Sequence, residues 1–440
     1  MIWTIVKREV LDNLMSLRLL FGTVLCLALV VISALVCLQD YQGRMDDYSN
    51  TLAQFNEESN VWNVKILKKP EVLSIFVRGF DDRLGNVANS VLDHFIPVTS
   101  DLIGSEEEGQ SVADLTSIDL LFVVRVFITL LAIFLSYDAI SGEYERGTLR
   151  LMLSRPVSRA SIILGKLIAG LMCLLIPLLI SFIIGVLIAQ LGSGVNFTSE
   201  EWLRVTLIFV ASTLCVSSFY MLGLVVSSKT RQAATSLLIL LLIWLTSVFL
   251  IPGMTTAIIG RYRLMTPHPD SNISAIYEDF WQNNPMPLEK MIREEWNRKT
   301  TEWQERSRSM YNSVWNIQEQ YLNRLYSQAD LARWICRSLP SESFAYAAEA
   351  MARTDTEAYK NFMNYVRSYH KPQTKLLDIA WMDSEKFREE GGKYNKAVQA
   401  PPLDFAASFR SAMPDICVLI VLNVLFFILS ILFFVRYSVR

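Results

Sequence analysis

The stretch SGEYERGTLRLMLSRPVSR, residues 141–159, separates two long apolar runs with an ordered mixture of glutamate, arginine, glycine and proline. Apolar residues dominate positions 120–135 before it and 162–188 after it. Because a helix needs about 20 consecutive apolar residues to cross the hydrocarbon core of a bilayer, each run is predicted to be a membrane span. The polar stretch is then the short loop that joins two spans on one side of the membrane.

The whole chain shows the same clustering of apolar residues. Of its 440 residues, 52% are hydrophobic and 19% are charged, and the apolar ones gather in six runs. We therefore predict an all-α polytopic membrane protein with six transmembrane helices. The spans are predicted at residues 19–37, 119–137, 161–191, 203–226, 235–252 and 415–435. The first is predicted to stay uncleaved because no A-x-A-like site follows it.

Residues 1–18 have the pattern of an amphipathic helix that lies in the membrane interface as an elbow before the first span. Its apolar residues recur at helical spacing and its charged residues occupy the other face. The apolar residues are Ile2, Trp3, Val6, Val10, Leu14 and Leu17, and the polar ones are Lys7, Arg8, Glu9, Asp12 and Asn13. The alternative is a leader that is merely solvated.

The basic residues of the short polar segments predict the orientation of the spans. Lys and Arg are in excess before the first span, in residues 138–160, between the fourth and fifth spans, and in the tail 436–440. With six spans all four segments fall on the same side, and the positive-inside rule makes this side cytoplasmic. We therefore predict a multi-pass protein of the bacterial inner membrane with both termini in the cytoplasm.

Two large segments, residues 38–118 and 253–413, are predicted to form mostly helical extracytoplasmic domains. Residues 41–58 are predicted to extend the first span outward as a helix. From position 287 to about 336, apolar residues recur every three, four or seven positions, which predicts one long helix with an apolar stripe.

Arg125 lies about six residues inside the predicted second span. An intramembrane arginine is costly and is by default a candidate functional residue. The alternatives are that it extends to the outer headgroups, or that it pairs with an acidic residue such as Asp119. Asp415 is predicted to lie near the start of the sixth helix, where a negative charge suits the helix dipole.

The sequence carries no constellation of residues that would support catalysis. His94, His268 and His370 form no HExxH motif, so no metal site is predicted. The segment nearest to a P-loop is ILGKL at 163–167. It lacks the glycine that a P-loop has upstream, and leucine follows the lysine where a P-loop has Ser or Thr. No basic tail or arginine-rich stripe points to nucleic acid. We predict that the chain is not an enzyme and binds neither metal nor cofactor.

Residues 137–170, YDAISGEYERGTLRLMLSRPVSRASIILGKLIAG, resemble the cytoplasmic segment of ABC type-two exporter permeases. That family shows Asp-x-x-x-Gly-Glu-x-Glu-x-Gly-Thr-Leu, then Pro-x-x-Arg, then Gly-Lys at the start of the next span. The matching residues are Asp138, Gly142, Glu143, Glu145, Gly147, Thr148, Leu149, Pro156, Arg159, Gly165 and Lys166. Residues 403–440 are similar to the last span of a subgroup with enlarged extracytoplasmic domains.

The resemblance implies that residues 138–160 hold a short coupling helix that docks into an ATPase. We predict the helix over residues 143–153, ended by Arg155-Pro156, with Ser158 placed to cap the next helix. The coupling residues implied are Asp138, Gly142, Glu143, Glu145, Arg146, Gly147, Thr148, Leu149, Arg155 and Pro156. The resemblance also implies a second permease subunit, as a homodimer or a closely related heterodimer, and two ATPase subunits that bind ATP and Mg.

The leading hypothesis is thus the permease subunit of an ABC exporter that moves a substrate outward or extracts it from membrane lipid. The very apolar spans fit a lipidic substrate or no substrate at all. The alternative is a mechanical transmitter, or an envelope assembly or sensor protein, that acts on a periplasmic or envelope partner through its extracytoplasmic domains. An intramembrane enzyme is disfavoured because such an enzyme has no use for the ordered set 142–149.

Overall fold

The computed structural model describes residues 2–57, 63–79, 87–91, 94–97, 118–149, 154, 158–193, 197–263, 269–284, 293–368 and 398–436. Within them six helical units are long and apolar enough to cross a membrane, so the number and order of the predicted spans are confirmed. Four spans are single helices: span 1 is α2 (Leu17–Glu57), span 3 is α9 (Arg159–Ser193), span 4 is α10 (Ser199–Ser227) and span 6 is α18 (Phe405–Arg436). Span 2 is built from α5 (Leu120–Phe122), the π-helical η2 (Val123–Ile128) and α6 (Thr129–Ser136). Span 5 is built from α11 (Ala233–Leu245), the π-helical η3 (Thr246–Leu250) and α12 (Ile251–Arg263).

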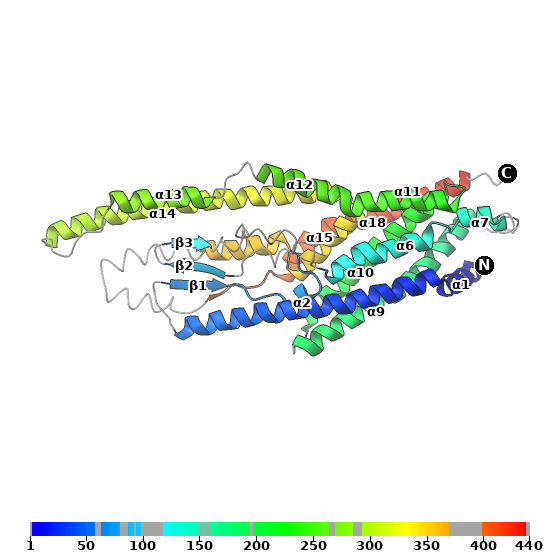
Figure 1. The fold of residues 1–440 in the computed structure, drawn as a ribbon, viewed down its shortest axis with the longest axis horizontal. Helices are drawn as coiled ribbons and strands as arrows, with labels where there is room; N and C mark the ends of the chain where they lie inside the picture. Colours follow the sequence, from blue (N-terminus) through cyan, green and yellow to red (C-terminus); the bar gives the residue numbers. More distant parts are fainter. Residues whose placement is uncertain are drawn as a thin grey trace.

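The molecule is elongated, and its two ends differ (Figure 1). Both chain termini and the short helix α7 (Ser141–Glu145) lie at one end, which we call the α7 end. The strands lie toward the other end, which we call the sheet end. The segments that were predicted to be cytoplasmic and that the structure describes are thus gathered at one end, as an even number of spans requires.

The spans pack through small residues, as expected where lipid tails compete with side chains for apolar surface. A Cβ added to Gly170 of α9 would lie 2.0 Å from Cζ of Tyr220, and one added to Gly223 of α10 would lie 1.8 Å from Oγ of Ser136. Large apolar side chains such as Phe21 and Leu242 are instead exposed on the outside of the bundle. This outside surface is the one that a bilayer would cover.

The predicted elbow is the helix α1 (Ile2–Leu14), which packs along α9. Val6 is buried, whereas Trp3 is 69% exposed and free to anchor in an interface. The helix stops before Ser16, whose Oγ accepts a hydrogen bond from the N–H of Leu19 and so begins α2. The first span therefore starts within the predicted elbow segment, at Leu17.

The prediction that the extracytoplasmic segments are two separate, mostly helical domains needs correction. The structure contains a four-stranded sheet in the order β3 (His94–Pro97), β2 (Val87–Val91), β1 (Asn63–Leu67), β4 (Val398–Gln399). Neighbouring strands are antiparallel except β1 and β4, which pair in parallel with Ile66 opposite Val398. Because β4 comes from the second polar segment, the two segments share one sheet.

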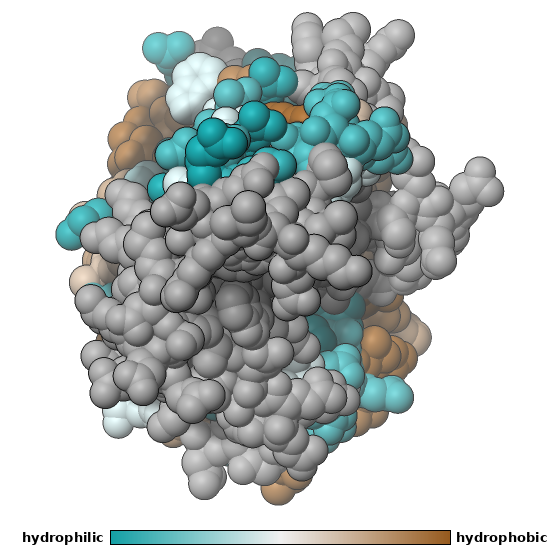
Figure 2. All heavy atoms as spheres, turned by 90° about the vertical axis from the view of Figure 1, so that its left-hand side faces the viewer, coloured by the Kyte–Doolittle hydropathy of each residue, from teal (hydrophilic) through white to brown (hydrophobic). Residues whose placement is uncertain are grey.

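The predicted long helix is confirmed as α14 (Arg293–Cys336), with residues 285–292 outside the described part of the chain. It forms a hairpin with α13 (Pro269–Asn283), as Figure 1 shows. A small apolar core joins the hairpin to the sheet, since Ile66 of β1 packs with Leu322 of α14 and Phe362. Figure 2 views the molecule onto its sheet end. The described residues that face the viewer are mainly hydrophilic, whereas hydrophobic residues are visible at the flanks.

A further helix, α15 (Pro340–Ala352), connects the external elements to the spans. Pro340 occupies its first turn, where the missing N–H is harmless. Small buried side chains let α15 lie close against α10 and α18. They include Ala345, Ala347, Ala348 and Ala350. Its first turn also contacts the π-helical segments η2 and η3 of spans 2 and 5.

Asp415 does not begin a helix, contrary to the prediction. Helix α18 starts at Phe405, and Asp415 lies inside it with no exposed side-chain surface. The carboxylate binds Arg333 at 2.7 Å and Arg337 at 2.6 Å, one within α14 and one just after it. The physical reason is that a buried carboxylate needs cations as partners, and the external helix supplies two.

Labelling of single cysteines tests the arrangement of the two ends. In spheroplasts of a variant whose six native cysteines are replaced by serine, a membrane-impermeant maleimide should label the exposed Ser327→Cys of α14. The exposed Ser154→Cys should be labelled only after permeabilisation, because it lies on the side predicted to be cytoplasmic. Labelling of both sites in sealed spheroplasts, or the reverse order, would contradict the six-span topology.

Removal of the Asp415 carboxylate should weaken the junction of α14 with span 6. Asp415→Ala leaves two arginines without their buried partner, which we expect to lower stability by about 3 kcal/mol or more. The matched control is Asp330→Ala, which removes a half-exposed partner of Lys360 and should cost about 1 kcal/mol at most. Thermal unfolding of the detergent-purified variants measures both, and equal losses would contradict the role of Asp415.

Candidate functional site

The predicted coupling segment folds around helix α7, whose first turn is held by span 4. Ser227, at the end of α10, accepts hydrogen bonds from the backbone N–H groups of Ile140 and Ser141, each at 3.0 Å. The helix has no side-chain cap from its own segment. Ser227 therefore satisfies N–H groups that a helix start leaves free, and it ties α7 to the end of span 4.

Asp138, just before α7, connects the segment to span 1. Its carboxylate accepts a hydrogen bond from Arg18 of α2 at 2.9 Å, and Arg146 approaches the same oxygen at 3.9 Å. Arg18 also lies over the ring of Tyr137, 5.1 Å from its centroid. A Cβ at Gly142 would lie 3.0 Å from the Cβ of Asp138, a tight contact that a side chain could make only if Asp138 shifted slightly.

Glu143 connects α7 to span 3 through a buried lysine. Lys166 of α9 is 2% exposed, and its Nζ donates to Glu143 at 2.8 Å and to Glu9 of α1 at 2.7 Å. One ammonium group thus joins the elbow helix, the coupling segment and the third span. A lysine in this position is costly without partners, and two carboxylates provide them.

The residues from Glu145 to Thr148 form the exposed face of the segment. Glu145 accepts a hydrogen bond at 3.3 Å from the N–H of Ala233, the first residue of α11, where a negative charge suits the helix dipole. Arg146 has 71% of its side chain exposed. Leu149 closes the segment and is buried. The exposed face is therefore small and lies on a segment bound to spans 1, 3, 4 and 5.

The predicted continuous helix over residues 143–153 is wrong in its extent. Helix α7 ends at Glu145, and Gly147 has a φ of +73°, a left-handed conformation that favours glycine. Thr148 and Leu149 are helical again, and Thr148 Oγ1 donates to the carbonyl of Glu143 at 3.2 Å. Glycine thus introduces a turn where periodicity alone predicted helix.

The second half of the segment is only partly described. Arg155 and Pro156 lie outside the described residues. The predicted cap is confirmed, since Oγ of Ser158 accepts a hydrogen bond from the N–H of Ser161 at 3.1 Å and begins α9. Arg159 donates to the carbonyls of Phe434 and Val435 at 2.9 and 2.8 Å. A cation there complements the C-terminal end of span 6.

The structure thus divides the predicted coupling residues into two groups. The first group faces the helical bundle and consists of Asp138, Gly142, Glu143 and Leu149. The second group, positions 145–148, is exposed. Their contact with an ATPase stays a prediction. Sequence reasoning missed the partners Glu9 and Ser227. Glu9 belongs to the charged face of the amphipathic helix, but nothing in its spacing singles it out from its neighbours.

Arg125 lies at the opposite end of the spans and does not pair with Asp119. It forms an ion pair with Glu342 of α15 and donates to the carbonyl of Val248 at 3.0 Å. Asp119 instead caps α5 by accepting from the N–H of Phe122 at 2.8 Å. Burial raises the pKa of Glu342 and the Arg125 charge opposes that change. The expected acidic partner exists, but it comes from the far half of the chain.

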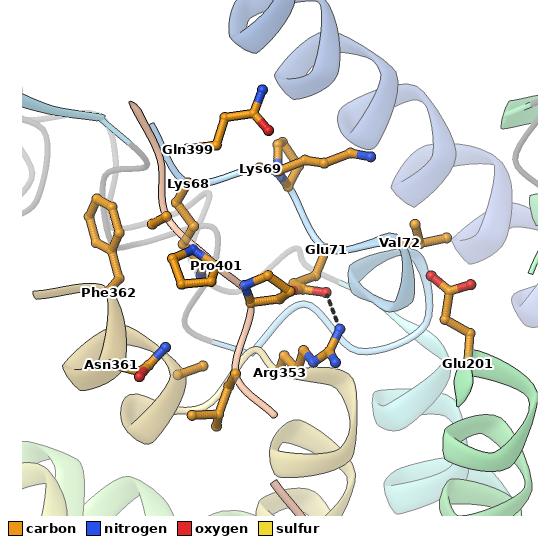
Figure 3. A pocket seen from close by; sticks show the side chains of 15 residues that line it. Lys68, Lys69, Glu71, Val72, Glu201, Arg353, Asn361, Phe362, Gln399 and Pro401 are labelled. Atoms are coloured by element: carbon orange, nitrogen blue, oxygen red, sulfur yellow. Dashed lines mark ion pairs between the residues drawn. The ribbon is translucent and has the colours of Figure 1, made fainter. Parts of the chain in front are cut away.

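A pocket of about 220 Å³ lies near the sheet (Figure 3). Arg353 points toward Glu71, with 3.6 Å between Nη1 and Oε2, and its other Nη binds Glu200 at 2.6 Å. Because this guanidinium is engaged by two carboxylates, the pocket does not present it to a ligand.

The six candidate membrane spans agree with the comparison with known families. A profile described as ABC-2 family transporter protein matches residues 3–439. The chain belongs to the ABC-2 family of transporter proteins. As an ABC-2 permease it is the membrane subunit of an ABC transporter, and membership implies a partner ATPase subunit.

Two curated relatives share part of the sequence of this ABC-2 permease. A probable ABC transporter permease protein NosY from Stutzerimonas stutzeri is 35% identical over 116 residues, 26% of this chain and 42% of the relative. The protein of the same description from Pseudomonas aeruginosa is 34% identical over 124 residues, 26% of this chain and 43% of the relative. The matches thus span less than half of either relative.

The lysine at the centre of the α7 end provides a test of the site's construction. Lys166→Met leaves the carboxylates of Glu9 and Glu143 without their cation and should destabilise the permease by about 3–5 kcal/mol. Replacing all three residues by methionine removes the charges together and should recover most of the loss. Thermal unfolding in detergent measures both.

The control for this test is Lys229→Met, an exposed lysine of the loop between spans 4 and 5, which should have little effect. If Lys166→Met unfolds no earlier than Lys229→Met, the buried triad does not hold the α7 end together.

Proposed function

We propose that this ABC-2 permease belongs to an ABC exporter and that positions 145–148 dock onto its separate ATPase subunit. The observation that carries the proposal is the bracing of α7. The segment has a small exposed face, and its buried side is bound to spans 1, 3, 4 and 5 and to α1. A displacement applied to the exposed face would therefore reach most of the bundle at once.

The proposed mechanism is a rigid-body switch. ATP and Mg bind to the partner ATPase, and closure of an ATPase pair displaces α7. Because Lys166 joins α7 to α1 and α9, these three helices move together instead of sliding past one another. The energy of ATP binding thereby shifts the equilibrium between two arrangements of the spans.

The assembly proposed is two permease subunits with two ATPase subunits, the second permease being a copy or a close relative of this chain. The site of action is the bacterial inner membrane, with the α7 end in the cytoplasm and the sheet end outside. The excess of Lys and Arg in the segments at the α7 end supports this orientation.

A lipidic substrate is supported by an apolar cavity of about 290 Å³ between spans 1 and 2. Its wall is almost wholly apolar, with Arg18 as the one charged lining residue. Other lining residues include Phe21, Leu25, Phe127 and Phe134. Such a cavity suits an acyl chain. Arg18 at its edge is already paired with Asp138 at 2.9 Å, so the proposal rests on the apolar wall.

The alternative, a mechanical transmitter acting on an envelope partner, is favoured by a different observation. The external α14 is tied to span 6 through the buried Asp415, with Arg333 and Arg337. A charged cluster inside an apolar junction holds two elements in one register. In this case hydrolysis would move the external hairpin and thereby the partner, with no substrate crossing the membrane.

Docking is tested by changing the charge of the exposed face, by reversal at Arg146 and by addition at Thr148. Arg146→Glu and Thr148→Arg should reduce the amount of P-loop ATPase that co-purifies in mild detergent about tenfold, because both positions are exposed and the Arg18–Asp138 and Lys166–Glu143 pairs are retained. Pull-down of the tagged permease followed by quantitative mass spectrometry measures the ratio of the two subunits.

Two further variants sharpen this test. Arg436→Glu reverses an exposed charge at the same end and should keep the ATPase bound. Glu143→Arg should lower the unfolding temperature of the permease itself, since Glu143 faces Lys166. If the ATPase stays fully bound to both Arg146→Glu and Thr148→Arg, the docking proposal fails.

A further inference from the structure

Three elements from distant parts of the chain meet around Arg125 at the sheet side of the spans. They are η2 of span 2, η3 of span 5 and the first turn of α15. The Arg125 guanidinium pairs with Glu342 and donates to the Val248 carbonyl. The two side chains of the ion pair are 21% and 7% exposed, so the pair lies largely out of solvent.

Both spans are π-helical where they meet α15. A π-helix bonds each N–H to the carbonyl five residues back, so a short π segment within an α-helix leaves carbonyls available to other donors. In η3 two carbonyls accept hydrogen bonds from neighbouring elements. The Val248 carbonyl accepts from Arg125 at 3.0 Å, and the Ser247 carbonyl accepts from Oγ of Ser341 at 3.3 Å. The irregular helix geometry is therefore matched to the docked position of α15.

The polar contacts continue from Arg125 between the two spans. Trp244 of α11 donates its indole N–H to Oγ1 of Thr129 at 3.0 Å. That hydroxyl donates in turn to the carbonyl of Arg125 at 2.5 Å. Both side chains are buried. Spans 2 and 5 are thus held against each other just inside the position where α15 covers them.

The covering helix cannot move independently of the external hairpin. Only residues 337–339 separate the end of α14 at Cys336 from the start of α15 at Pro340. The other end of α15 is held by Arg204 of α10, which donates to the Met351 carbonyl at 2.9 Å. A displacement of α14 would therefore act on the α15 turn that carries Glu342.

We propose that Arg125 is a positioning residue that latches α15 across the outer ends of spans 2 and 5, so that the external hairpin and the outward opening of the spans share one equilibrium. Opening breaks the Arg125–Glu342 pair and releases the η3 carbonyls. A protein that binds the α13–α14 hairpin shifts the same equilibrium from outside, because coupling between two sites is reciprocal. The outward direction rests on the proposed function, but the latch does not.

The native Cys215 of α10 gives a probe for the opening. Its side chain is fully buried, and it belongs to a helix that contacts both η2 and α15. In a variant that keeps Cys215 and has the other five cysteines replaced by serine, a charged methanethiosulfonate reagent is added outside right-side-out vesicles. The latched protein should react slowly.

Loss of the latch should expose the thiol. Arg125→Met and Glu342→Gln should each raise the rate of Cys215 modification at least tenfold. The reversed pair, Arg125→Glu with Glu342→Arg, should return the rate to within about threefold of the starting protein. The control is Arg367→Gln, which breaks a pair with Glu319 in the external domain and should leave the rate unchanged. A rate unchanged in both Arg125→Met and Glu342→Gln would overturn the latch.

A reversible cross-link tests whether the hairpin must move. Sγ of Cys336, at the end of α14, lies 3.5 Å from Oγ1 of Thr255 in α12. Thr255→Cys therefore allows a disulfide between α14 and the extension of span 5. In the Arg125→Met background with Cys215 and Cys336 retained, this disulfide should suppress modification of the Cys215 peptide, measured by mass spectrometry, at least fivefold. Reduction with dithiothreitol, removed before the reagent is added because it would cleave the mixed disulfide, should restore that modification.

Equal modification with and without the disulfide would overturn the coupling of α14 to the opening. None of these measurements uses the ATPase, so their failure is distinguishable from failure of the docking proposal, which co-purification reports.

Discussion

A charge inside an apolar bundle must have an opposite charge beside it, and this constraint organises both ends of the permease. At the α7 end the charge is Lys166, and the carboxylates that neutralise it come from the elbow helix and from the coupling segment. At the other end the charges are Arg125 and Asp415, whose partners come from α15 and from the end of α14. In each case the requirement for a partner fixes how a peripheral element sits on the spans.

This distribution is consistent with the proposal that the subunit transmits motion between its two ends. The spans themselves meet through glycine, serine and aliphatic contacts, which allow helices to adjust relative to one another. The attachments at either end are ionic and directional, which favours discrete arrangements over gradual deformation. An exporter and a mechanical transmitter both need such attachments. They differ in whether spans 2 and 5 part, and the buried Thr129 and Trp244 now hold these spans together.

The six spans and the Ser158 cap could be predicted from the sequence because their signals are local. A long apolar run and a helix-capping serine can each be recognised from neighbouring residues alone, without reference to the rest of the chain. The strands escaped prediction because they are short and β1 pairs with residues near the other end of the sequence. The partner of Arg125 was missed for the same reason. Glu342 lies in a helix rich in alanine whose burial against α10 and α18 has no periodic signature.

The parallel pairing of β1 with β4 has a consequence for biogenesis. Residues 66–67 reach the sheet end soon after the first span inserts, but their partners at 398–399 arrive only after four more spans and the α13–α14 hairpin. Until then one edge of β1 presents unpaired N–H and C=O groups, which invite strand addition by other chains. The external domain is therefore completed by the last polar residues before span 6. The sheet can therefore be completed only after nearly the full length of the chain has been inserted and translocated.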